Sequence, residues 1–210
     1  SQLTEAERNK IAERVAQYTG LDKEYVLQSN LRIKDTRFFK ELLRKQGRTT
    51  GRLDSRFTGF DADSAGESIE FDPSMSAILG PYTATLNDYI RRDLEFSSDL
   101  PYEILTDRVQ PWKFGPAENR YLNVAETLRK AIANNQNLRV FVASGYYDLA
   151  TPYFATEYTF DHLSLPEELL ENISIAYYQA GHMMYIREAS LEKLKKDIER
   201  FIESALTGRD

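Results

Sequence analysis

The stretch Leu138-Arg139-Val140-Phe141-Val142-Ala143-Ser144 decides the fold class. It is short, mostly apolar and rich in β-branched and aromatic residues, and Gly145 follows it directly. A run of this kind is typical of a parallel strand that is buried on both faces. We therefore predict a strand over residues 138–144 that belongs to a parallel sheet.

Helices and strands alternate outward from this strand. Helical spacing precedes it at about 122–134 and follows it at 153–163, and Ile173-Ser174-Ile175-Ala176-Tyr177-Tyr178 predicts a second strand. One stripe of a closing helix is formed by Leu191, Leu194, Ile198, Phe201 and Ala205. This alternation predicts an α/β fold with parallel strands and right-handed crossovers, although two strands are few for a complete sheet.

The first fifty residues predict small helices instead. Thr4-Glu5-Ala6-Glu7 has the form of a capping box, and Gly20 is a candidate end of the helix that the box opens. Asp22 and Asp35 are candidate caps of two more short helices, the second of which closes near Gly47.

The chain then changes character twice. Residues 48–82 lack helical periodicity and contain many glycines and prolines, so we predict an irregular loop there, followed by a helix at about 82–95. We accordingly divide the chain into a helical cap region with long irregular segments, residues 1–120, and a carboxyl-terminal α/β portion, residues 121–210.

Two polar residues directly follow the predicted strands: Asp148 comes after the first and His182 after the second. Reactive groups of open α/β sheets gather at the carboxyl ends of strands, and neighbouring strands lie about 4.8 Å apart, so a carboxylate can reach an imidazole there. Asp before His is also the order of the Ser, Asp, His triad in α/β-hydrolases. We predict a catalytic pair. The alternative is that Asp148 caps the helix near Pro152 and that His182 is a loop histidine bonded to backbone.

Four segments carry a resemblance to a known family. Val142-Ala143-Ser144-Gly145-Tyr146-Tyr147-Asp148 and Tyr178-Gln179-Ala180-Gly181-His182-Met183-Met184-Tyr185 resemble the Asp and His blocks of the serine carboxypeptidase family, in its bacterial carboxypeptidase-related branch. Arg52-Leu53-Asp54-Ser55-Arg56-Phe57 and Asn123-Val124-Ala125-Glu126-Thr127-Leu128 are similar to the same branch. The resemblance therefore covers nearly the whole chain.

The resemblance implies a partial α/β-hydrolase fold, with a helical cap over the active site. By position, Asp148 matches the family's catalytic Asp and His182 its catalytic His. In the complete protein, a serine-type carboxypeptidase, His182 would pass the serine's proton to the leaving group of a peptide or ester substrate while Asp148 fixes the imidazole tautomer. The resemblance implies no cofactor or metal. Met184-Tyr185 departs from the family pattern, which leaves the substrate side chain open.

The family's nucleophile elbow, Gly-Glu-Ser-Tyr-x-Gly, has no good counterpart. Gly66-Glu67-Ser68-Ile69-Glu70 lacks the buried strand before it and the Tyr and Gly after the serine, and Ser144 ends a strand without the required glycines. The chain begins at Ser1 without a methionine, which suits a piece of a longer protein. We expect the nucleophile in a missing amino-terminal half and expect this chain to be inactive alone.

A calcium loop is a second partial match. Asp61, Asp63, Gly66 and Asp72 stand at its first, third, sixth and twelfth positions, but Ala65 occupies the fifth, where a ligand belongs. We favour a solvated loop.

Three further features favour structural interpretations. A basic stretch followed by acidic residues predicts internal ion pairing or a solvated face of the cap rather than a nucleic-acid surface. His162 has no second ligand at helical spacing, and we expect Trp112 and Phe114 to pack in the interior rather than to line a pocket. The basic residues are Arg32, Lys34, Arg37, Lys40, Arg44, Lys45, Arg48, Arg52 and Arg56.

The composition limits the classes of partner that we expect. With 41% hydrophobic residues the chain should be globular, and a net charge of −6 argues against nucleic acid as a partner. No apolar run has the length of a membrane helix, so we expect no membrane partner and a chain that is soluble as given. The absence of cysteine excludes disulfides but leaves the compartment open, a periplasmic or secreted full-length protein included.

Two rival functions stay open at this stage. The chain could be a binding or scaffold module without chemistry, which associates with the missing half or with itself through exposed strand edges. The complete protein could instead be an esterase or acyltransferase, because the fold does not fix the reaction.

Overall fold

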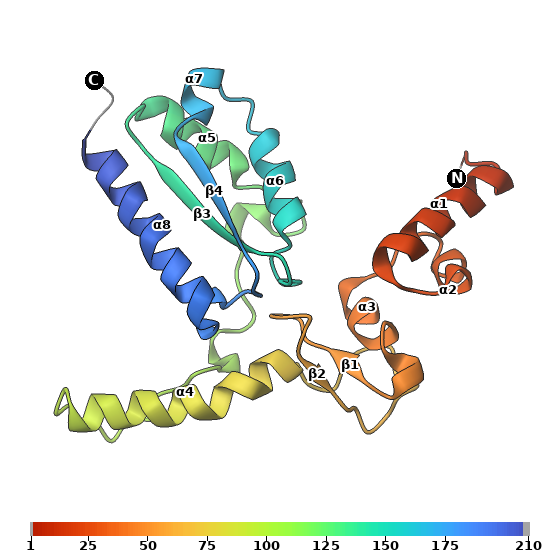
Figure 1. Cartoon of the computed structure of the whole chain (residues 1–210), viewed down its shortest axis with the longest axis horizontal. Coiled ribbons are helices and arrows are strands. Elements are labelled where there is room, and N and C mark those ends of the chain that lie inside the picture. Colours follow the sequence, from red (N-terminus) through yellow and green to blue (C-terminus); the bar gives the residue numbers. More distant parts are fainter. Residues whose placement is uncertain (1, 208–210) are drawn as a thin grey trace.

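The structure is a computed structural model that describes residues 2–207, so Ser1 lies outside the described part of the chain. Three parts follow one another: small helices with a hairpin, a long projecting helix, and a parallel sheet between helices (Figure 1). The helices are α1 (Glu5–Thr19), α2 (Lys23–Gln28), α3 (Asp35–Glu41), α4 (Pro73–Arg92), α5 (Ala125–Asn134), α6 (Tyr153–Asp161), α7 (Glu167–Leu170) and α8 (Glu188–Leu206). The strands are β1 (Thr49–Thr50), β2 (Thr58–Gly59), β3 (Val140–Gly145) and β4 (Ile173–Tyr178). Short 3₁₀ helices span Arg44–Gln46, Asp107–Val109, Gly115–Ala117 and Met184–Ile186.

Strands β3 and β4 form a parallel pair, in register from Val140 opposite Ile173 to Gly145 opposite Tyr178. The segment between them contains α6 and α7 and serves as the crossover. The parallel pairing confirms the central prediction from the sequence: β4 has the predicted bounds, and β3 begins two residues later than expected. The fold is mixed helix and sheet, with sheets of two strands among the described residues.

Helices cover both faces of this sheet (Figure 1). Alternate strand residues such as Val140 and Ile173 pack with Ile132 of α5 and with Leu163 after α6. The opposite face packs against α8, where the ring of Phe141 lies 5.5 Å from that of Phe201. Cover on both faces is consistent with the continuous apolar runs of the two strands, although most strand residues are buried only in part.

The amino-terminal helices follow their predicted caps in part. The capping box at Thr4 is present, and Gly20 ends α1 with a φ of 77°, a conformation that glycine adopts without strain. Asp22 precedes α2 without a capping bond and pairs with Lys45 instead. Asp35 is the first residue of α3 rather than its cap.

The predicted loop over 48–82 is wrong in two places. Residues 49–50 and 58–59 form the antiparallel hairpin of β1 and β2, and α4 begins at Pro73, nine residues before the predicted start. Asp72 caps α4 by accepting the Ser74 amide, and Pro81 lies inside the helix. Gly80 and Pro81 look like a break in the sequence, but the helix continues through them.

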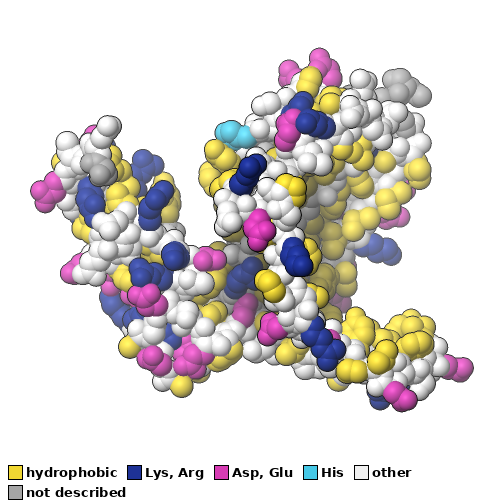
Figure 2. Space-filling model, turned by 180° about the vertical axis from the view of Figure 1, so that it is seen from behind, with side chains coloured by type: hydrophobic (Ala, Val, Ile, Leu, Met, Phe, Trp, Pro, Cys, Tyr) yellow, Lys and Arg dark blue, Asp and Glu magenta, His cyan; other side chains and the backbone are white. Residues whose placement is uncertain are grey.

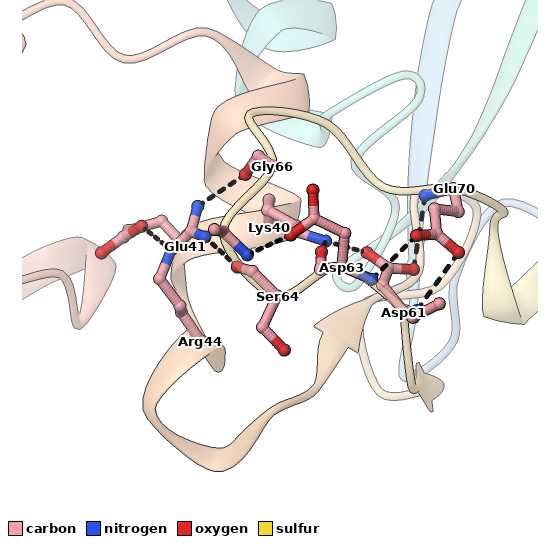
Figure 3. Close-up of polar contacts among 10 residues, drawn as sticks. Lys40, Glu41, Arg44, Asp61, Asp63, Ser64, Gly66 and Glu70 are labelled. Carbon is pink, nitrogen blue, oxygen red and sulfur yellow. Dashed lines mark hydrogen bonds and ion pairs between the residues drawn. The ribbon is translucent and has the colours of Figure 1, made fainter.

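Residues 60–70 form a loop that a charged network holds in place (Figure 3). The buried Lys40 and Asp61 form an ion pair, and Arg44 donates to the Gly66 carbonyl at 2.9 Å. Arg37 pairs with Glu67 at 2.8 Å. Of the two interpretations offered for this basic stretch, internal ion pairing is present at Arg37 and Lys40.

The same contacts bear on the partial calcium match. Asp61 is paired with Lys40, Asp63 accepts the Ala65 amide, and Asp72 caps α4. Within residues 2–207 no three potential metal-ligating side chains cluster. Most residues from 60 to 70 are exposed, as expected for a solvated loop, and protein donors hold its buried Asp61.

Candidate active site

Asp148 ends a tight turn after β3 and is buried, with 4% of its surface exposed. Its Oδ1 accepts the backbone N–H groups of Ala150 at 2.8 Å and of Thr151 at 2.9 Å. Its Oδ2 accepts the Thr151 hydroxyl at 2.6 Å. These bonds order the turn that leads into α6. The N-cap of α6 is Pro152, without a side-chain bond, so the structure does not show the capping role that the sequence offered as an alternative.

His182 lies in the loop after β4 and reaches the same carboxylate. Its Nδ1 is 2.8 Å from Oδ2 of Asp148, and the Thr151 hydroxyl lies 3.2 Å from the same nitrogen. The His182 side chain is 43% exposed, so the imidazole is open to solvent while its carboxylate partner is not. The structure thus brings the two predicted residues together at one edge of the sheet.

Electrostatics keep the Asp148 carboxylate charged. Burial alone would raise the pKa of Asp148, but hydrogen bonds from Thr151, His182 and the Ala150 amide lower this pKa overall. A carboxylate that is ionised at neutral pH accepts the Nδ1–H bond of a neutral imidazole, which leaves Nε2 with a free lone pair. That tautomer is the one a general base requires.

The two loops that carry this pair are joined backbone to backbone. We define the Asp loop as residues 146–151 and the His loop as residues 179–182. The Tyr147 amide donates to the Ala180 carbonyl at 3.1 Å. A Cβ added to Gly145 would clash with the carbonyls of Ala180 and Gly181, so glycine is required at this close approach.

The serines considered as nucleophiles lie elsewhere. Ser68 is exposed in a bend, and neither a strand directly precedes it nor a helix directly follows it. Ser144 is buried within β3. Among the described residues, the hydroxyl bonded to the imidazole is that of Thr151, and it sits on Nδ1 rather than on the nitrogen that would take a proton.

The other residues that the sequence analysis considered lie outside this site. His162 follows α6, its Nδ1 lies 2.6 Å from the Tyr158 carbonyl, and its ring stacks on Tyr158, in keeping with a structural role. Trp112 and Phe114 are 64% and 50% exposed, so the expectation of interior packing is wrong. Almost every residue from 91 to 124 is exposed, so no packed interior forms around either ring.

Two contributors to the site were not singled out from the sequence. Thr151 stands three residues after Asp148, a spacing that signals a turn but not a contact with an imidazole. The sequence marks residues 52–56 by their resemblance and by the basic Arg52 and Arg56, but not as contacts of the site, yet they bond directly to both loops. These contacts of residues 52–55 join positions 92 to 129 apart in the chain, and no local sequence pattern predicts them.

Comparisons of the chain with models of protein families, with curated proteins and with solved structures find no match. The functional argument therefore rests on the geometry of the site. No described helix is long and apolar enough to cross a membrane.

Proposed function

We propose that this chain supplies the Asp and His of a Ser, Asp, His triad, as the carboxyl-terminal part of a serine-carboxypeptidase-like α/β-hydrolase. One observation carries the proposal: the 2.8 Å contact between Nδ1 of His182 and the buried carboxylate of Asp148, made by loops that leave the same edge of two parallel strands. The order of the residues and the helices on both sheet faces support it.

In the proposed reaction His182 acts through Nε2. It accepts the proton of the serine hydroxyl as the oxygen attacks the carbonyl carbon, and it returns that proton to the leaving amine or alcohol as the acyl-enzyme forms. Water then repeats the sequence and releases the acid. Asp148 stays ionised throughout, orients the ring and stabilises the imidazolium.

The remaining parts of such a site would lie upstream. The serine, the oxyanion hole and the groups that recognise a substrate carboxylate are assigned to a preceding half, whose strands would extend the sheet of β3 and β4. This follows from the placement of Ser68 and Ser144, since neither has the strand-to-helix turn that exposes a nucleophile. The chain alone is then expected to be inactive.

A hydrolysis assay tests this function. The protein extended upstream is expected to release the carboxyl-terminal residue of blocked dipeptides, and His182→Ala is expected to abolish release. Esters and acyl acceptors in the same assay distinguish a peptidase from an esterase or acyltransferase of the same fold. Full activity of the His182→Ala variant would contradict a triad role.

A second candidate is a binding module without chemistry. It is favoured by the apolar side chains exposed along α4 and the segment after it (Figure 2). Under that hypothesis, Asp148→Ala and His182→Ala variants would leave association with a partner unchanged, and no substrate would be turned over by the extended protein.

A further inference from the structure

Residues 52–55, which we call the bridging segment, bond to the backbone of the Asp loop on both sides of Asp148. The Leu149 amide donates to the Arg52 carbonyl at 3.0 Å. The Ser55 amide donates to the Tyr147 carbonyl at 2.9 Å. The residues directly before and after the catalytic aspartate are thus attached to the two ends of one short segment.

The middle of the same segment holds the His loop. The His182 amide donates to the Leu53 carbonyl at 2.7 Å, and the Gly181 amide donates to Oδ2 of Asp54 at 3.0 Å. A Cβ added to Gly181 would clash with the Leu53 carbonyl and the Asp54 side chain, so the segment lies in direct contact with the loop. The backbone amides of Gly181 and His182 are therefore bonded to two consecutive residues of the bridging segment.

Asp54 is built to hold this position. Its side chain is 1% exposed, and a buried carboxylate needs its oxygens satisfied by donors. Oδ1 accepts the amide and the Nε of Arg56, and Oδ2 accepts Nη2 of Arg56 at 2.6 Å in addition to the Gly181 amide. The Arg56 guanidinium also donates to the Gln179 carbonyl at 3.1 Å and lies 4.5 Å from the centre of the Tyr147 ring. Arg56 therefore contacts both loops as well.

We propose that Asp54, with Arg56, is a positioning residue that holds the imidazole of His182 against Asp148. Its buried carboxylate fixes the His loop through the Gly181 amide, while the bridging segment fixes the Asp loop on the other side. Neither side chain touches the reacting atoms. The catalytic meaning of this role rests on the proposed function, but the positioning itself concerns the imidazole and its carboxylate alone.

The test is Asp54→Asn, read by ¹⁵N NMR of the His182 ring. An Asn side chain has nearly the same size as Asp. Because N–H donors approach both oxygens of Asp54, the NH₂ group of Asn must face a donor on one side and loses that hydrogen bond. We expect the wild-type chain to show the Nδ1–H tautomer and the variant to lose it to a mixture of tautomers. In the protein extended upstream, serine labelling by a fluorophosphonate should slow about 10- to 100-fold.

Asp61→Asn is the matched control. Asp61 is also a buried aspartate in an ion pair, with Lys40, and its described bonds go to neither loop. This control variant should keep the wild-type tautomer even if it loses as much stability. A folded Asp54→Asn variant with the wild-type tautomer would overturn the proposal, and so would an equal change in the control.

Arg56→Lys decides the matter if Asp54→Asn does not fold. The lysine keeps a positive charge near Tyr147 but cannot donate to both oxygens of Asp54 as the Arg56 guanidinium does, so the Nδ1–H signal of His182 should weaken in part. An unchanged signal would overturn the positioning role. Failure of the proposed function is a separate outcome. If no version of the protein is labelled by the fluorophosphonate, the triad proposal fails while the tautomer comparison still decides the role of Asp54.

Discussion

The two carboxylate oxygens of Asp148 accept hydrogen bonds from different groups. Oδ1 takes backbone amides that order the turn before α6, and Oδ2 takes the imidazole and the Thr151 hydroxyl. From the sequence, a helix cap and a catalytic partner are competing interpretations of this residue. In the structure one carboxylate orders the turn before α6 and also contacts the imidazole, because a carboxylate has about four lone-pair sites and the backbone amides and the imidazole approach different oxygens.

Asp148→Asn should leave the fold intact but disturb the imidazole. The amide can present its NH₂ group to Nδ1 and so favour the tautomer with the proton on Nε2, which cannot act as a base. Fluorophosphonate labelling of the protein extended upstream should fall about 10³- to 10⁴-fold, by comparison with triads of this kind. Labelling within about a factor of two of the wild-type rate would argue against the triad.

Acid should weaken the contribution of Asp148 to stability. The pKa of this carboxyl is lower in the folded chain than its unfolded value of about 3.9, so its stabilisation is present above that pH and is lost as the pH falls through the folded pKa. The difference in free energy of unfolding between wild type and Asp148→Asn should therefore shrink below about pH 4. Urea unfolding between neutral and acidic pH measures it; a constant difference would contradict the pKa shift.

Gly181→Ala should displace His182 without removing any polar group. The added Cβ meets the Leu53 carbonyl and Asp54, so the His loop and the bridging segment must move apart. We expect a loss of stability of about 1 to 3 kcal/mol and loss of the Nδ1–H signal of His182. A folded variant with an unchanged signal would show that the close contact does not govern the ring.

At the residue level, the sequence indicates the pair but not its support. Asp148 and His182 are predictable because each stands just after an apolar run, where strands end. Asp54 is not, because its bond to Gly181 spans 127 positions and depends on tertiary packing. Thr151 is visible only as part of a turn.

The elements with strong periodicity are the ones that the sequence predicts well. The two apolar runs and the stripe of α8 need no tertiary information, and they appear as β3, β4 and α8. The start of α4 was missed because Gly80 and Pro81 suggest a break, whereas a capping aspartate and a proline in the first turn open the helix at Pro73. Strands of two residues, such as β1 and β2, are too short to leave a pattern.

Helix α8 is attached to the sheet by a polar contact that can be tested alone. The buried Tyr178 donates to Oδ2 of Asp197 at 2.8 Å, and Lys193 pairs with the same oxygen at 2.6 Å. Bonds from Lys193 and Tyr178 help lower the pKa of Asp197. Tyr178→Phe should lower the free energy of unfolding by about 1 to 2 kcal/mol, measured by urea denaturation. Exposed Tyr82→Phe is the control, and equal losses in both would contradict this role.

At the scale of the whole molecule, the chain leaves much apolar surface uncovered. The sheet of β3 and β4 has two strands, so each has an outer edge without a strand partner among residues 2–207. Large side chains are exposed on α4 and on the segment after it: Leu79, Tyr82, Tyr89, Leu94, Phe96, Leu100 and Tyr102. These features suit a chain that is completed by a further half.

Association should follow from this surface. The isolated chain is expected to self-associate with rising concentration, and an added upstream half should convert it to a one-to-one complex. Light scattering after size-exclusion chromatography measures both. A chain that stays monomeric at every concentration and does not bind the upstream half would contradict the proposed assembly.

The central claim is that Asp148 and His182 serve a serine outside this chain. Labelling with a fluorophosphonate, mapped by mass spectrometry, tests it most directly when the chain and its upstream extension are compared. The account predicts that the short chain stays unlabelled, that the extended protein is labelled on one upstream serine, and that His182→Ala abolishes this labelling. Labelling of Ser68 in the short chain, or upstream labelling that survives His182→Ala, would contradict it.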